Sequence, residues 1–170
     1  MVRLEHVLDS WNKVRQDTVS AVEDFPAAEF DFRPAADVQS FREVARHILN
    51  AGHGLTALML DGVLDFAAPS YREQLKSLVI PLPEGGTQAE LAAALRQSIA
   101  ERLPQLAAQP PEFYDAMMTR MDGVQLTRLE MLLTIKEHEL VHRAQLFLCM
   151  RMKGIVPVTT RRRLARAASK

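Results

Sequence analysis

The sequence predicts an all-α fold, an antiparallel four-helix bundle with long crossover loops. Four long segments space their apolar residues three and four positions apart, which gathers them on one face of a helix. Three of these segments follow a Ser/Thr-x-x-Glu capping box, which satisfies the free amides at a helix start. No segment alternates convincingly as a β-strand does, so the four apolar faces are expected to pack against one another.

The first two helices are separated by a loop that contains prolines. The first helix is expected over residues 4–23, where Trp11 lies in the middle of the apolar stripe. A capping box of Ser40 and Glu43 starts the second helix, and the Asp-Gly pair at 61–62 ends it.

A Pro- and Gly-rich crossover over residues 62–86 leads to the third helix, which is expected over residues 88–107. Within the crossover, Ser70 and Glu73 are expected to cap a short helix. The third helix itself follows a capping box at residues 87–90.

A second irregular stretch, residues 109–125, is expected to contain a short extended piece. The longest helix then starts at the box formed by Thr127 and Glu130. It runs to about Lys153 and ends at Gly154, with a proline beyond it.

We expect one domain over residues 1–158, followed by a basic tail over residues 159–170. The tail carries five cations: Arg161, Arg162, Arg163, Arg166 and Lys170. Such a run is usually a solvated, frayed end, and the alternative is an adhesive surface. No aromatic residue is interleaved to stack on bases, which favours the solvated end.

Charge and cysteine content limit the partners. Basic and acidic residues balance at 21 each, so no net field attracts nucleic acid or a membrane surface. The single cysteine, Cys149, lies in an apolar run and is expected to be a buried thiol in a reducing cytoplasm. The N-terminus lacks the apolar stretch of a secretion signal, and no segment reaches the length of a membrane helix, so a soluble protein is expected.

Three of the five histidines fall on inner helix faces. His138 and His142 are four residues apart, so both imidazoles project from one side of the last helix. His47 has an equivalent inward position on the second helix. Three neutral imidazoles suit zinc, nickel, iron or copper and leave one coordination position open for water or substrate. The alternative is that these are core histidines that only form hydrogen bonds. That interpretation would suit a single histidine better than three at compatible positions on two helices.

Residues 138–142 also match the H-E-x-x-H pattern of zinc peptidases, in which the glutamate is a general base. That hydrolase interpretation expects a sheet edge to align a peptide and a third ligand further down the chain. The sequence predicts neither. Glu139 has three alternative roles: proton acceptor in catalysis, anchor of a ligand histidine, or solvated surface residue.

The sequence resembles the DinB-like family of metal-binding four-helix bundles. The resemblance covers nearly the whole chain and rests on Phe32-Arg33-Pro34 with Ser40, Glu43 and His47, on His138-Glu139-x-x-His142-Arg143-Ala144-Gln145, and on Gly154-x-x-Pro157. It implies that His47, His138 and His142 bind one divalent metal ion, with zinc or nickel preferred and iron or another ion as alternatives.

The resemblance also implies a function. Several relatives use the ion to activate a low-molecular-weight thiol, which adds to a small electrophile or isomerises a conjugated acid. We therefore expect a metal-dependent thiol S-transferase or isomerase, with a homodimer as its assembly. The alternative is a non-catalytic metal-binding bundle that serves stress response or interaction.

The remaining candidates are expected to be structural. His53 lies six residues after His47 and faces away from it, and His6 is expected at the surface. Trp11 is expected in the core rather than in a cleft. Arg143 and Gln145 could orient an anionic substrate or a partner helix. The alternative is that each is a salt-bridge or interface residue, as charged and amide residues late in a helix usually are.

Overall fold

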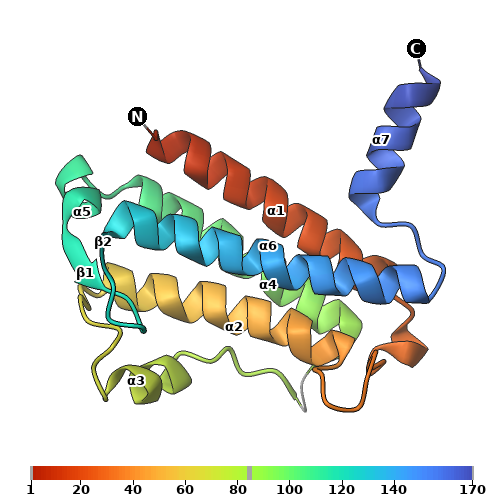
Figure 1. The fold of residues 1–170 in the computed structure, drawn as a ribbon, viewed down its shortest axis with the longest axis horizontal. Coiled ribbons are helices and arrows are strands. Elements are labelled where there is room, and N and C mark those ends of the chain that lie inside the picture. Colours follow the sequence, from red (N-terminus) through yellow and green to blue (C-terminus); the bar gives the residue numbers. More distant parts are fainter. Residues whose placement is uncertain (1, 84–85, 170) are drawn as a thin grey trace.

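The bundle is built from four long helices in the part of the chain that the computed structural model describes, residues 2–83 and 86–169. They are α1 (Leu4–Asp24), α2 (Phe41–Leu60), α4 (Gln88–Ala107) and α6 (Arg128–Met152). Helices α1 and α6 run in one direction and α2 and α4 in the other (Figure 1). Each of α1 and α2 packs against both α4 and α6. The all-α bundle with a long crossover is therefore confirmed.

The three predicted capping boxes of the long helices form and fix where the helices begin. At α2, the Ser40 hydroxyl accepts from the Glu43 amide at 3.2 Å, and the Glu43 carboxylate accepts from the Ser40 amide at 2.7 Å. The same reciprocal pair starts α4 and α6. Because such a cap stabilises a helix by about 1 kcal/mol, the starts of these helices follow directly from the sequence.

The crossover between α2 and α4 contains a short helix, α3 (Tyr71–Ser77), as expected. Its predicted capping box is wrong, because the Ser70 side chain makes no capping hydrogen bond. Ser70 has φ −69° and ψ −19°, already helical, whereas a capping serine needs extended backbone to turn its hydroxyl toward the first turn. Glu84 and Gly85 of the predicted crossover lie outside the described residues.

The irregular stretch before α6 folds into a helix and a hairpin, which confirms the expected extended piece. Helix α5 (Pro111–Asp115) leads into strands β1 (Met117–Thr119) and β2 (Gln125–Thr127), which pair antiparallel. A short 3₁₀ helix (Ala27–Glu29) lies in the loop after α1.

The expected frayed end is wrong for most of its length, because helix α7 (Val158–Ala168) forms there and projects from the bundle (Figure 1). Two ion pairs connect the N-terminal part of α7 to α1. Arg161 pairs with Asp24 at 2.6 Å, and Arg162 pairs with Asp17 of α1 at 2.6 Å. Lys170 lies outside the described residues. Among those residues, no helix is long and apolar enough to cross a membrane.

The core consists of two apolar clusters with a polar layer between them. One cluster contains Trp11, Leu55 and Ile135, and the other contains Val22 and Leu146. On α1 and α6, the positions between the two clusters hold the buried polar residues Arg15, Thr18 and Glu139. Burying two charges is costly unless they are paired and fully hydrogen-bonded, so the contacts of this layer decide whether it stabilises the bundle.

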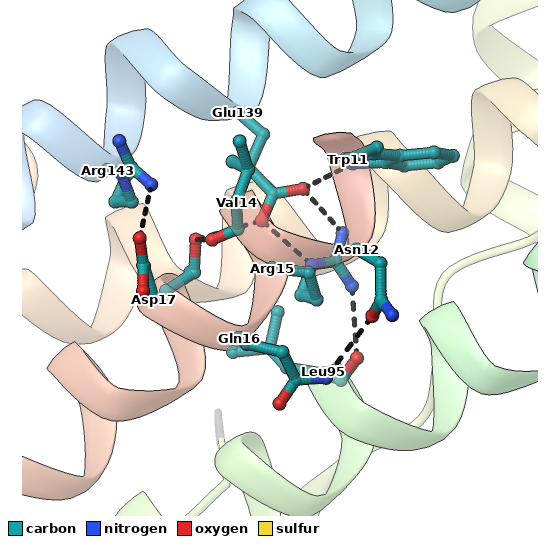
Figure 2. Close-up of polar contacts among 10 residues, drawn as sticks. Trp11, Asn12, Val14, Arg15, Gln16, Asp17, Leu95, Glu139 and Arg143 are labelled. Atoms are coloured by element: carbon teal, nitrogen blue, oxygen red, sulfur yellow. Dashed lines mark hydrogen bonds and ion pairs between the residues drawn. The ribbon is translucent and has the colours of Figure 1, made fainter. Parts of the chain in front are cut away.

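Arg15 and Glu139 form a closed ion pair at the centre of the bundle, with exposed fractions of 1% and 2% (Figure 2). The guanidinium donates to both carboxylate oxygens, at 2.8 and 2.9 Å, and to the Leu95 carbonyl of α4 at 3.1 Å. Helix α2 approaches closely because it has Gly52 there, where a Cβ would lie 2.8 Å from the Arg15 Nη2 atom. The pair therefore touches all four helices.

We predict that Arg15→Met lowers the free energy of unfolding by about 3–5 kcal/mol, because it leaves the Glu139 carboxylate buried and unpaired. Urea unfolding of the metal-free protein measures this. The double variant with Glu139→Leu should recover most of the loss, since no buried charge remains. The matched control is Arg96→Met, whose pair with Glu23 is about half exposed and should contribute less than about 1 kcal/mol. Equal effects of Arg15→Met and Arg96→Met would contradict the central role of the pair.

Candidate metal centre

The structure brings together the three histidines that the sequence singled out. One ring nitrogen from each of His47, His138 and His142 lies within 4.8 Å of the other two. The His138 Nε2 atom is 3.0 Å from that of His47 and 3.1 Å from that of His142. The His138 Nε2 atom has either one proton or one lone pair, so it cannot form a full hydrogen bond with both neighbouring nitrogens at once. An ion shared by the three nitrogens would satisfy all of them.

Local helix geometry explains this placement. His138 and His142 are one turn apart on α6, so their side chains share a face. His47 lies near the start of α2, which packs against α6. All three histidines are half-buried, so a bound ion would be supported by protein on one side and open on the other.

Gln145 orients the third imidazole. The His142 Nδ1 atom lies 2.9 Å from the Gln145 Oε1 atom, an oxygen that can only accept a hydrogen bond. This contact places the His142 proton on Nδ1 and leaves the Nε2 lone pair toward the cluster. Outer contacts of this kind fix the tautomer of metal-binding histidines. This contact lies within α6, so both roles expected for Gln145 stay predictions.

Burial lowers the pKa of two of the three imidazoles. Burial, followed by the neighbouring His142 and His47, lowers the pKa of His138 to about 4. The pKa of His47 is also lowered, first by burial and then by His142. Neutral imidazole is the form that binds metal ions, so these rings would not need to lose a proton at pH 7.

Two clefts meet at His47 and Asn50. One has a volume of about 510 Å³ and lies between the start of α2 and the preceding loop, with Arg33, Asp37 and Arg46 in its lining. The other has a volume of about 290 Å³ and lies between α2 and the α3 region. An ion at the triad would therefore face solvent-accessible space on both sides of one α2 turn.

Glu139 points toward α1, where it meets Trp11 and Arg15 (Figure 2). Its oxygens accept two bonds each: from Arg15 and Thr18 on Oε1, and from Arg15 and Trp11 on Oε2. Burial excludes the solvated alternative. A general base needs a free lone pair that faces its substrate, so the proton-acceptor role stays a prediction that this geometry does not favour. The arrangement fits an anchor that orients α6.

The other candidates occupy structural positions. His53 faces α4, where it contacts Ser98 and Arg102, and His6 is exposed near Arg3, as expected. Trp11 is 1% exposed and belongs to the core. Arg143 pairs with Asp17 at 3.2 Å, which supports its salt-bridge alternative.

Cys149 is buried, as predicted, and burial raises the pKa of its thiol. Its sulfur would therefore not serve as a nucleophile at neutral pH.

Sequence reasoning missed Asn50 and the partners of Glu139. Asn50 lies three residues after His47, so helical periodicity could have placed it beside the triad. Arg15 carried no comparable signal, because a charged residue in an amphipathic helix is usually exposed.

Residues 10–146 match the family model described as the DinB superfamily. The structure is similar to a DinB-like protein from Bacillus subtilis, with a TM-score of 0.67 and 19% identity over 88% of this chain and 92% of that one. A DinB-like protein from Bacillus cereus ATCC 10987 has a TM-score of 0.67 and 19% identity, over 91% of this chain and 95% of its own.

A mycothiol-dependent maleylpyruvate isomerase is also similar, with a TM-score of 0.62 and 13% identity. The match covers 85% of this chain but only 61% of that enzyme. At these identities the structural likenesses show the fold alone. No curated protein sequence matches this chain.

We predict that the metal-free protein loses stability as the pH falls from about 6.5 toward about 4. In this window an unfolded His138 binds a proton that the folded one does not, so the free energy of unfolding must decrease. Urea unfolding across this range measures the effect. The variant His138→Gln should show a shallower decline, and equal slopes in both proteins would contradict the lowered pKa.

We predict that Gln145→Ala weakens metal binding about tenfold or more, because His142 loses the contact that fixes its tautomer. Competition with a chelator of known affinity measures this. The matched control is Gln97→Ala on α4, which removes only an exposed contact with Glu101. If the two variants bind metal equally well, Gln145 has no role at the centre.

Proposed function

Because this chain belongs to the DinB superfamily, we propose that it is an enzyme whose divalent metal ion, bound by His47, His138 and His142, activates a low-molecular-weight thiol for attack on a small electrophile. The observation that carries the proposal is the convergence of three ring nitrogens within 4.8 Å beside two clefts. The reaction is of the S-transferase or isomerase type.

The donor set fits such an ion. Two imidazole nitrogens on one tetrahedral zinc ion would lie about 3.3 Å apart. Two of the three nitrogen pairs here are 3.0 and 3.1 Å apart, and all three nitrogens lie within 4.8 Å of one another, so side-chain adjustments would bring them around one ion. Zinc and nickel both suit a three-imidazole set, as does iron, and occupancy follows metal availability.

The site is open rather than closed. Within residues 2–83 and 86–169, no cysteine, carboxylate or further histidine joins the three-histidine cluster. Structural zinc sites normally have four protein ligands, whereas catalytic sites keep one position for water or substrate. This favours the enzyme over the non-catalytic metal-binding bundle.

When bound, the ion would supply a Lewis acid that lowers the pKa of a coordinated thiol, so that the thiolate forms at neutral pH. The chain's own residues do the rest. Neutral His47 and His138 offer lone pairs, and Gln145 holds His142 in the matching tautomer. The cleft beside α3 offers Leu75 and Val79 as apolar contacts for the body of the thiol.

The reaction balances without an oxidant or a reductant. The thiol releases its proton to solvent, and the sulfur lone pair forms a bond to the electrophilic carbon. In a transfer reaction, a leaving group departs with its bonding pair or the new carbanion takes a proton from water. In an isomerisation, the carbon–sulfur bond breaks again after rotation, and the thiol is regenerated.

The structural likeness to a mycothiol-dependent maleylpyruvate isomerase supports this class of reaction. The hydrolase interpretation of H-E-x-x-H is weaker, because its general base would be Glu139, which Arg15 already holds. We also propose a cytoplasmic homodimer without nucleic-acid or membrane partners. The exposed apolar side chains of Val141, Leu148 and Met152 on α6 support self-association.

We predict that the untagged protein binds about one divalent ion per chain and that His138→Ala and His142→Ala each lose it. Elemental mass spectrometry measures the metal content. The matched control is His53→Ala, which lies on α2 but faces α4 and should keep the metal. Metal at background level in the wild-type protein would overturn the proposed function.

A further inference from the structure

We propose that Asn50 and Arg72 form a subsite that selects a carboxylate-bearing thiol with an N–H group near its sulfur. The inference rests on the proposed function, and it names the thiol class that the same site takes. Two observations carry it: the Asn50 amide oxygen beside the triad is buried without a partner in the described part of the chain, and the two clefts differ in charge.

Asn50 is the residue that both clefts share with His47. Its Oδ1 atom is buried and has no hydrogen-bond partner among the described residues. Buried acceptors are nearly always satisfied, so this oxygen, which no group of the described chain occupies, is available to a hydrogen-bond donor that enters the clefts. Because Asn50 is one helical turn from His47, a ligand at the triad reaches this oxygen with a group a few atoms from its sulfur.

The cleft between α2 and α3 suits the negative end of such a ligand. Its lining contains two cations, Arg72 and Lys76, and no acidic residue. The nearest carboxylate on α3, that of Glu73, lies 3.6 Å from the Lys76 ammonium. Arg72 has no ion-pair or hydrogen-bond partner among the described residues, so its guanidinium is available for a carboxylate.

The cleft on the other side of His47 does not suit an anion as well. Arg33 and Arg46 are offset there by Asp37 and Glu43, and Arg33 is already paired with Glu43 at 2.9 Å. An anionic ligand would meet the Asp37 carboxylate on this side. The asymmetry therefore directs the carboxylate toward Arg72 and leaves the larger cleft for the electrophile.

The ligand that fits these features has a thiol for the triad, an N–H donor for the Asn50 oxygen and a carboxylate for Arg72. N-acetylcysteine has all three groups, and it serves as the probe. N-acetylcysteamine lacks only the carboxylate, 3-mercaptopropionate lacks only the N–H group, and 2-mercaptoethanol lacks both.

The experiment loads the protein with cobalt(II) and titrates each thiol, following the cobalt absorption spectrum as the measure of binding. We expect N-acetylcysteine to bind about tenfold tighter than N-acetylcysteamine and about fivefold tighter than 3-mercaptopropionate. Arg72→Gln should abolish the preference over N-acetylcysteamine and leave the preference over 3-mercaptopropionate. Asn50→Ala should have the opposite effect: the preference over 3-mercaptopropionate is lost and the preference over N-acetylcysteamine stays.

Two controls separate this inference from general effects. Arg46→Gln removes a cation from the opposite cleft and should leave both preferences unchanged. Arg72 is exposed, so its variant should melt like the wild type, which keeps the test valid if Asn50→Ala folds poorly.

The outcomes distinguish the two proposals. If all four thiols bind cobalt with similar affinity, the proposed function stands and the Asn50–Arg72 subsite is overturned. If the protein holds one cobalt ion and no thiol changes the spectrum, the proposed function itself fails. A carboxylate preference that survives Arg72→Gln would also overturn the subsite.

Discussion

The closed ion pair between Arg15 and Glu139 constrains the rest of the structure. It lies between the two apolar clusters, and its satisfaction requires α1, α4 and α6 to hold one relative position while Gly52 lets α2 approach. A buried pair of this kind contributes little net stability, but an unpaired member is costly, so other helix rotations are penalised. Because Glu139 follows His138 directly, anchoring it to α1 turns the histidines of α6 toward α2.

The arrangement of the three histidines therefore depends on a contact in which none of them takes part. The pattern H-E-x-x-H divides into two functions on two faces of α6: the histidines face His47, and the glutamate faces Arg15. This separation explains why a formal peptidase motif occurs in a bundle whose geometry favours a different chemistry. It also leaves the cluster half-buried and open to two clefts of different charge, with the pKa of His138 lowered to about 4.

The sequence was most informative where the determinants are local. Reciprocal caps such as Ser40 with Glu43 predicted where the long helices begin, and the four-residue spacing of His138 and His142 predicted a shared face. Features that depend on tertiary charge pairing were missed. The burial of Arg15, the role of Glu139 and the folding of α7 against Asp17 all need partners from distant parts of the chain. Ser70 failed as a cap because its backbone is already helical.

In the proposed centre, three imidazoles hold an ion with one exchangeable position. Zinc-edge X-ray absorption of the zinc-loaded protein, with and without N-acetylcysteine, reports the ligands of that ion. We predict three nitrogen ligands and one oxygen ligand at about 2.0–2.1 Å, with the oxygen replaced by a sulfur at about 2.3 Å when the thiol is added. A zinc ion with four protein ligands, unchanged by the thiol, would contradict it.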